Sequence, residues 1–230
     1  MLYWLEEHPV AFPAVEEAQD EPNGLLAAGG ALTPEWLLTA YLHGIFPWFN
    51  AEDPILWWTP DPRMVLYPEE FRCRRSLEKR IRNGGFTLTF DTAFKEVMQY
   101  CGSLRDDTWI SPQMIQAYHD LHLLGYAHSV EVWHEGELVG GLYGLALGRV
   151  FYGESMFSRC PDASKVALAH LTRLPDEYGF ALIDCQVYSD HLASLGAREI
   201  DRDHFNAVLE QHASLERWQP PRQYSPATTG

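Results

Sequence analysis

The feature of the sequence that most constrains its fold is a run of three strand-like segments joined by short turns, at residues 127–158. The segment AHSVEVWH alternates from Ala127 onward, which is typical of a strand. The residues between His134 and Glu137 supply a turn, ELVGGLYGLAL returns, and Gly148 allows a second turn into RVFYGESMFS. Because such short turns join antiparallel neighbours, these segments predict an antiparallel meander.

Helices and strands are expected on both sides of this meander. A helix capped at Asp162 or Ser164 runs through KVALAHLTRL, and the apolar strand FALIDCQVY follows it. Before the meander we expect a basic helix from about residue 76, a strand at 86–90, and helices at 92–101 and 112–124. This mixture predicts an α+β fold, although the order of elements alone carries no chemistry.

The first 62 residues have a different character and predict a small N-terminal domain. They contain one clear helix, with Thr33 as N-cap, Pro34 in its first position and Gly44 after its end. The segments FPWFN and ILWWTPDPR are expected to be aromatic loops. We therefore expect an N-terminal domain at 1–62, a catalytic domain at 63–213, and a loosely ordered, Pro-rich tail at 214–230.

The cysteines and the N-terminal residues indicate the compartment in which the protein is expected. The four cysteines lack Cys-x-x-Cys spacing, which disfavours both a zinc site and a disulfide framework. The start, MLYWLEEHPVAFP, carries acids where a secretory signal needs bases, and no segment offers 18 uninterrupted apolar residues. We expect a cytoplasmic protein that does not enter a membrane and that uses no metal and no cofactor.

The charge of the chain is unevenly distributed. The net charge is −15, yet the segment RCRRSLEKRIR at 72–82 has six basic residues and one acid, a net charge of +5 against −20 for the rest. The segment could be a solvated helix face. In so acidic a chain it also suggests contacts with a phosphate backbone. The candidate contacts are Arg72, Arg74, Arg75, Lys79, Arg80 and Arg82.

Glu154 is the first candidate for chemistry, because it lies inside the apolar strand FYGESMFS. Strict alternation places Tyr152 and Met156 on the same face as Glu154. A buried carboxylate requires a partner or a function. The structural alternative is an ion pair with an arginine such as Arg159, and the position alone does not separate the two interpretations.

Asp184 and Gln186 form the second candidate, in the segment LIDCQ. Residues two apart on a strand point to one face, so an acid and an amide could orient one reacting group together. The alternative is that both mark the exit of the strand to solvent, and without further context this alternative is favoured. Carboxyl ends of strands do, however, often border ligand crevices.

The other chemical patterns are weaker. Trp48, Trp57, Trp58 and Trp109 could stack on a base, although tryptophan is more often a core residue. His119, His122 and His128 are close in sequence but lack an acidic ligand pattern. There is no nucleophile elbow, Walker loop or dinucleotide fingerprint. The glycine-rich turn that binds the pyrophosphate of coenzyme A is replaced by SRCPDASK.

Long motifs over nearly the whole chain resemble the leucyl/phenylalanyl-tRNA-protein transferase family. They include GLLAAGGALTPEW, FPWF, WWTPDPR, DDTWISPQM, GRVFYGESMFS, DASKVALAHL and LIDCQVYSDHLASLGAREI. The resemblance implies a C-terminal domain related to the GNAT N-acyltransferases, consistent with the predicted order of meander, helix and strand. It also implies transfer of Leu or Phe, and possibly Met, from aminoacyl-tRNA to proteins beginning with Arg or Lys. In bacteria such transfer marks proteins for degradation by the N-end rule.

The same resemblance assigns roles to individual residues. The site motifs of the family fall on Glu154, Asp184 and Gln186, and its tryptophans beside the 3′ adenosine fall on Trp48 and Trp109. Its apolar pocket for the Leu or Phe side chain maps onto Leu142, Phe151, Met156 and Ile183.

We expect a monomer, and the reaction that the resemblance implies is aminolysis of an ester. Asp184, acting through Gln186, would handle the proton of the acceptor amine. Glu154 would bind the cationic acceptor or the adenosine hydroxyls. Two alternatives remain: an acetyl-CoA-dependent N-acetyltransferase, and a non-catalytic adaptor for basic N-termini.

Overall fold

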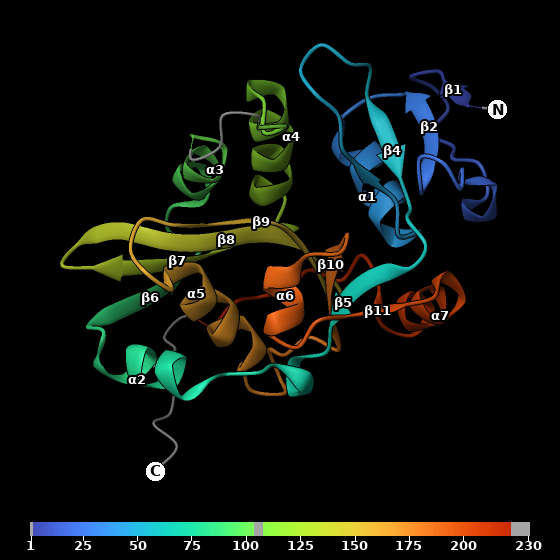
Figure 1. The fold of residues 1–230 in the computed structure, drawn as a ribbon. Helices are drawn as coiled ribbons and strands as arrows, with labels where there is room; N and C mark the ends of the chain where they lie inside the picture. The colour runs from blue at the N-terminus through green and yellow to red at the C-terminus, as the bar shows by residue number, and fades with distance from the viewer. Residues whose placement is uncertain (1, 104–107, 222–230) are drawn as a thin grey trace.

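A seven-stranded mixed sheet forms the centre of the molecule in the computed structural model, which describes residues 2–103 and 108–221. Its strand order is β11-β5-β10-β9-β8-β7-β6 (Figure 1). The strands are β5 (Arg63–Leu66), β6 (Phe86–Phe90), β7 (Ala127–His134), β8 (Glu137–Leu147), β9 (Val150–Ser158), β10 (Leu182–Gln186) and β11 (Arg198–Ile200).

The predicted meander is confirmed as β7, β8 and β9. Glu135 and Gly136 between β7 and β8 both have positive φ, 51° and 83°, as a tight turn that matches strand twist requires. Helix α5 (Ala163–Thr172) then returns the chain to β10, which pairs with β9 in parallel. The α+β class and the predicted order of meander, helix and strand are thus both present.

Helices cover both faces of this sheet (Figure 1). Helices α3 (Phe94–Ser103) and α4 (Pro112–Leu123) pack on one face, and α5 and α2 (Arg75–Asn83) on the other, with α6 (Asp190–Ser194) beside β10. Two separate apolar cores result, one on each face. Within the described residues, no helix combines the length and the apolarity needed to cross a bilayer.

The N-terminal part forms its own four-stranded sheet, in the order β1-β2-β4-β3. Helix α1 (Pro34–Leu42) begins as predicted, with the Thr33 side chain accepting from the Trp36 amide. The prediction of aromatic loops was wrong in part, because these segments contain β3 (Phe46–Pro47) and β4 (Leu56–Trp58) beside β1 (Tyr3–Leu5) and β2 (Leu25–Gly29). Strands of two or three residues are too short to leave a pattern of alternation.

Several elements near the C-terminus were not predicted. They are β11, helix α6 and helix α7 (Arg202–His212), and the short helices η1 (Val15–Glu17) and η2 (Pro68–Glu70) were missed as well. The first part of the predicted loose tail is attached to the fold, since Arg217 bridges to Leu147 and the buried Trp218 indole donates to the Tyr178 carbonyl at 2.8 Å. Residues 222–230 of that tail lie outside the described residues.

A buried glutamate on β7 makes stability depend on pH. Glu131 accepts hydrogen bonds from the hydroxyls of Ser129 and Thr89 and from the amides of Thr92 and Ala93. Burial raises its pKa from the usual 4.5 to about 7, which outweighs those hydrogen bonds. A raised carboxyl pKa favours the folded state at low pH, and this contribution is lost as pH rises through about 7.

We expect Glu131→Gln to flatten the pH dependence of unfolding between pH 5 and pH 8. Each pKa unit corresponds to about 1.4 kcal/mol, so wild type should lose up to about 3 kcal/mol there through this residue. Chemical denaturation at both pH values measures the difference. Glu137→Gln, at an exposed position on β8, serves as the control. Equal pH dependence in wild type and Glu131→Gln would contradict the assignment.

Candidate active site

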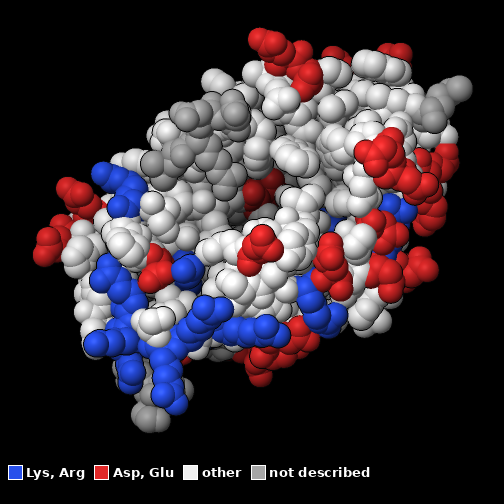
Figure 2. Space-filling view, in the orientation of Figure 1, with Lys and Arg blue, Asp and Glu red and all other residues white. Residues whose placement is uncertain are grey.

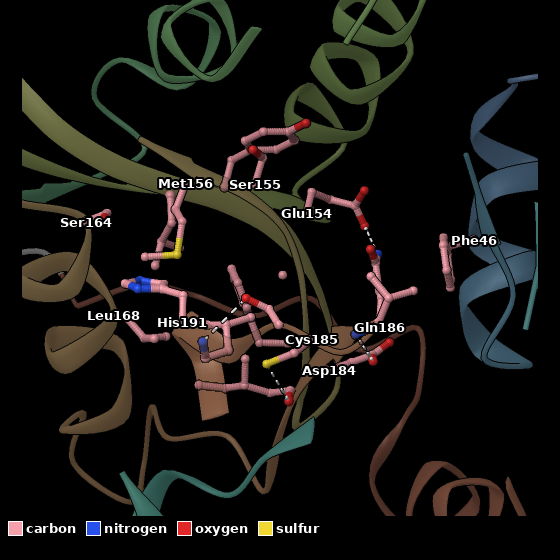
Figure 3. A pocket seen from close by; sticks show the side chains of 18 of the residues that line it. Phe46, Glu154, Ser155, Met156, Ser164, Leu168, Asp184, Cys185, Gln186 and His191 are labelled. Carbon is pink, nitrogen blue, oxygen red and sulfur yellow. Dashed lines mark hydrogen bonds between the residues drawn. The ribbon is translucent and has the colours of Figure 1, made fainter. Parts of the chain in front are cut away.

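A cavity of about 700 Å³ opens where strands β9 and β10 part. Their parallel pairing ends at Tyr152 and Asp184, and beyond this point Glu154 on β9 and Gln186 on β10 face each other across the gap (Figure 3). Residues from both apolar cores, such as Leu142 and Tyr143, line the cavity, which is therefore bounded from both faces of the sheet. On the surface, a hollow near the centre of the face in Figure 2 has acidic atoms at its bottom.

A β-bulge places Glu154 in this gap. Tyr143 pairs with Ser155 and Gly144 pairs with Gly153, so Glu154 is an extra residue of β9 without a partner on β8. At Gly144 the two strands approach so closely that a Cβ would lie 2.1 Å from the Tyr152 carbonyl oxygen. Only glycine fits there.

Because of the bulge, the predicted facing of the side chains along this strand was wrong. Strict alternation puts Tyr152 and Met156 on the same face, but the structure places Tyr152 in the core under α3 and α4 and packs Met156 against the core under α5. Met156 instead shares its face with Phe151, five residues earlier. One extra residue between them reverses the alternation.

Glu154 accepts three hydrogen bonds. The Tyr41 hydroxyl donates to Oε1 at 2.6 Å, the Tyr118 hydroxyl donates to Oε2 at 3.1 Å, and the Gln186 Nε2 donates to Oε1 at 2.7 Å. Burial raises the pKa of Glu154 from its usual 4.5 to about 7, although the three hydrogen bonds oppose this shift. The expected alternative partner, Arg159, binds Tyr100 and the Leu138 carbonyl instead.

The two tyrosines come from different parts of the chain. Tyr41 lies on α1 of the N-terminal part and Tyr118 on α4, and their hydroxyls also contact each other. Burial raises the pKa of each well above the usual 10, so both hydroxyls remain protonated donors near neutral pH. The sequence offered no signal for this pair, because each tyrosine is an ordinary apolar-face residue of its own helix.

Gln186 has an unusual backbone. Its φ is +65°, and a second bulge at Cys185 interrupts the pairing of β10 with β5. The Gln186 amide donates to Asp184 Oδ1 at 2.9 Å, which holds this conformation. Asp184 and Gln186 were expected to orient one group together, but their side chains have different partners: the Gln186 side chain reaches Glu154, and the Asp184 carboxylate does not.

Asp184 forms a buried ion pair with Arg63, which was not predicted. The Arg63 Nε donates to Oδ1 at 2.9 Å and its Nη2 donates to Oδ2 at 2.7 Å, and both side chains are almost fully excluded from solvent. The guanidinium also lies between the rings of Phe46 and Phe205, at 4.7 Å from each centroid. The only signal in the sequence was a lone arginine at the expected domain boundary.

The four residues expected to form an apolar pocket do line this cavity together. They are Leu142, Phe151, Met156 and Ile183, and Leu168 and Leu171 of α5 extend the same wall. His191 of α6 also lines the cavity (Figure 3). A compact apolar site thus adjoins the polar pair of Glu154 and Gln186, which is an arrangement suited to holding an apolar side chain with its reacting group at the polar end.

The tryptophans divide into two groups. Trp48, which is 42% exposed, and Trp109 line the cavity. Trp57 is a core residue whose ring stacks on Trp36, and Trp58 donates its indole N–H to the Trp48 carbonyl. Trp48 and Trp109 alone among the four are therefore placed to contact a bound ligand in this cavity.

The basic segment forms a surface away from the cavity. Five of its six cations are exposed on or before α2, and none of the six lines the cavity. Figure 2 shows Lys and Arg gathered at this end of the face, where Figure 1 places α2. Arg80 is half-buried and lies over the Phe86 ring, and the acid of the segment, Glu78, pairs with Arg173.

Two of the three neighbouring histidines form hydrogen bonds within the fold. His128 Nδ1 binds Asp91 at 2.8 Å, and His122 Nδ1 binds the Ala127 carbonyl at 2.8 Å. In residues 2–103 and 108–221, no group of three or more His, Cys, Asp or Glu side chains is placed to hold a metal ion.

Solved structures resemble the chain only distantly. A GCN5-related N-acetyltransferase from Kribbella flavida is 12% identical, with a TM-score of 0.38, over 72% of this chain and 60% of its own. L-PGS from Bacillus licheniformis is 11% identical, with a TM-score of 0.39, over 70% and 55% of the two chains.

Comparison of sequences is far more informative. The family model for leucyl/phenylalanyl-tRNA protein transferase matches residues 65–210, and the model for the N-terminal domain of that family matches residues 30–61. A leucyl/phenylalanyl-tRNA–protein transferase from Chromohalobacter salexigens is 64% identical over 93% of this chain and 85% of the relative. One from Azoarcus sp. is 56% identical over 99% and 97%. Because the two family models match residues 30–61 and 65–210 and these relatives match nearly the whole chain, the chain belongs to the leucyl/phenylalanyl-tRNA protein transferase family and is an aminoacyltransferase.

Proposed function

We propose that this enzyme transfers Leu or Phe from aminoacyl-tRNA to the α-amino group of proteins that begin with Arg or Lys, and that it also accepts Met. The observation that supports this proposal best is that an apolar pocket adjoins the Glu154–Gln186 pair in a cavity that Trp48 and Trp109 also line. The pocket suits the aminoacyl side chain, the polar pair suits the amine, and the tryptophans suit the 3′ adenosine.

The reaction is aminolysis of an ester. The acceptor nitrogen bonds to the aminoacyl carbonyl carbon, the bond from that carbon to the ribose oxygen breaks, and the released ribose oxygen takes up a proton. An α-amino group has a pKa of about 7.7 to 8.0, so near neutral pH much of it must first lose a proton. A base whose pKa lies near the working pH is best suited to accept it.

We propose that Glu154 accepts this proton from the amine. Its pKa of about 7 is suited to the task, and its contact with the Gln186 amide places both groups beside one amine. Gln186 would then orient the amine or the developing oxyanion. Tyr41 and Tyr118 fix the carboxylate in position.

This assignment changes the role first expected of Asp184. Both oxygens of Asp184 already accept hydrogen bonds from Arg63, inside the fold. These bonds, and the one that Oδ1 accepts from the Gln186 amide, hold the Asp184 carboxylate toward Arg63 and the backbone. Asp184 therefore acts on the backbone of Gln186 rather than on the proton.

The apolar pocket accounts for the choice of amino acid. Each methylene that a substrate side chain lacks costs about 1 to 3 kcal/mol of binding in a hydrophobic pocket, so Leu and Phe bind well while Ala and Val bind weakly. Met156 is a flexible side chain that can adapt to a branched or a flat ligand. The same adaptability extends the proposal to Met.

One assay tests the proposed function against its alternatives. Labelled Leu-tRNA, Phe-tRNA, Met-tRNA or acetyl-CoA is offered with peptides that begin with Arg, Lys or Glu. We expect label from the three aminoacyl-tRNAs on the Arg and Lys peptides. Transfer from acetyl-CoA instead would support an N-acetyltransferase, and binding of the Arg peptide without any transfer would support an adaptor.

The proposal also has a cellular setting. Because charged tRNA is made and used in the cytoplasm, the reaction belongs there, and its products would enter N-end rule degradation.

We propose that the basic surface at 72–82 binds the tRNA phosphates. Arg74→Glu combined with Arg75→Glu should weaken tRNA binding at least tenfold at low salt and reduce the salt slope of log K by about 2, because two phosphate contacts are lost. Filter binding across a salt series measures both. Lys95→Glu, at an exposed position on α3 across the sheet, is the control. Unchanged binding by the double variant would remove this surface from the tRNA site.

A further inference from the structure

Arg63 lies outside the cavity lining but next to the residues that form it. It belongs to β5, between β10 and β11 in the sheet, and its side chain is 1% exposed. Its hydrogen bonds to Asp184 and its position between two phenylalanine rings fix the guanidinium from three sides.

We infer that Arg63 is a positioning residue for Gln186, acting through the Asp184 carboxylate. The inference rests on the proposed function, since it concerns the same site. Asp184 Oδ1 accepts from Arg63 Nε and from the Gln186 backbone amide, each at 2.9 Å. One oxygen atom thus joins the arginine to the residue whose side chain meets Glu154.

Gln186 needs such support because its backbone is strained. A φ of +65° is unfavourable for a residue with a Cβ, and such conformations persist only where the surroundings enforce them. The bulge at Cys185 removes regular pairing at this point, so the bond to Asp184 replaces it. If Asp184 turns, the Gln186 side chain no longer meets Glu154 at 2.7 Å. A displacement of about 1 Å can cost 100-fold in rate.

The two rings connect the site to distant elements. Phe46, on β3 of the N-terminal sheet, lines the cavity, and the Arg63 guanidinium lies over its ring. Phe205, on α7, supports the other side, although α7 supplies no residue to the cavity lining. The planar guanidinium is suited to this double stacking and to the two-point contact with Asp184, and an ammonium group is not.

Arg63→Lys tests the inference, with Arg198→Lys as a matched control. Arg198 makes the same kind of two-point contact with Glu70 and lies over the Tyr67 ring, but it is exposed at the edge strand. We expect Arg63→Lys to lower kcat 10- to 100-fold with the KM for aminoacyl-tRNA within about twofold, at a temperature where both variants are folded. Arg198→Lys should match wild type.

A double variant separates positioning from general damage. If Arg63 acts through Gln186, Arg63→Lys combined with Gln186→Ala should be no slower than Gln186→Ala alone. Independent effects would multiply, and that result would overturn the inference. Phe205→Leu removes one ring beside Arg63 but keeps the ion pair. It should lower kcat less than Arg63→Lys does, and it should likewise add no loss to Gln186→Ala. This variant therefore tests the inference even if Arg63→Lys folds poorly.

Hydrogen exchange gives a readout that needs no substrate. The Gln186 amide should exchange faster in Arg63→Lys than in wild type, while the amides at the centre of β8 stay protected. Unchanged protection of Gln186 would overturn the inference whatever the enzyme transfers. Loss of protection in a protein that transfers no amino acid would refute the proposed function alone.

Discussion

Glu154→Gln should slow aminoacyl transfer 10²- to 10⁴-fold, the largest kinetic effect expected of any single substitution in this protein. Glutamine has nearly the same shape but cannot accept the proton of the acceptor amine. The new side-chain NH₂ group would also face donors, because Tyr41, Tyr118 and Gln186 all donate hydrogen bonds to this position. Single-turnover transfer from Phe-tRNA to an Arg peptide, at saturating concentrations of both, measures the effect.

The pH profile identifies the cause of that loss. In wild type, transfer should rise with pH through about 7, as Glu154 loses its proton, and also through the ionisation of the amine. In Glu154→Gln the only remaining rise in rate should be the one caused by deprotonation of the acceptor amine, whose pKa is about 7.7 to 8.0.

Two tyrosine variants serve as comparisons. Tyr118→Phe removes one hydrogen bond to Glu154 and should slow transfer less than Glu154→Gln does, and Tyr126→Phe, outside the site, should leave the rate unchanged. Loss of less than tenfold in Glu154→Gln would exclude Glu154 as the proton acceptor.

Asp184→Asn should cause the largest loss of stability, about 3 to 5 kcal/mol in the free energy of unfolding. Removing one partner of a buried ion pair leaves the other as an unpaired charge. Here the remaining charge would be the Arg63 guanidinium, enclosed by Phe46 and Phe205. Urea denaturation followed by far-UV circular dichroism measures the change, and Asp190→Asn on the surface helix α6 provides a control.

A second substitution should restore much of that stability. Arg63→Met with Asp184→Leu removes both charges and fills similar space, and apolar replacements of buried pairs are often neutral or stabilising. We expect this double variant to be more stable than Asp184→Asn but at least 10-fold slower than wild type, because nothing then accepts the hydrogen bond of the Gln186 backbone amide. Equal destabilisation of both variants would show that packing, and not the unpaired charge, causes the loss.

The sequence predicts much of the fold where elements are long and regular. The meander at 127–158 and the helix that begins at Pro34 follow from periodicity and capping, and both are confirmed. The β3 and β4 strands were missed because they contain two and three residues. Strands β5 and β11 were missed because their partners lie far away in the chain, and no local pattern records such a pairing.

The site was predictable in its residue types but not in its geometry. A carboxylate in an apolar strand made Glu154 a candidate, but the pattern of Asp184 and Gln186 favoured an ordinary strand end, and only the resemblance to the family assigned all three to a site. The two bulges could not be foreseen, because an extra residue leaves the composition of a strand unchanged and alters only its facing. Arg63 could not be foreseen either, since its partner lies 121 positions later.

The two bulges have a consequence for the packing of the sheet. Glu154 on β9 and Cys185 on β10 are each one residue more than the neighbouring strand can pair. Deleting Glu154 would turn every later residue of β9 to the other face of the sheet, so Met156 and Phe157 would exchange the cores that they now fill. The residue that reaches the cavity is therefore also one that the packing of the sheet cannot lose, which ties the site to the stability of the fold.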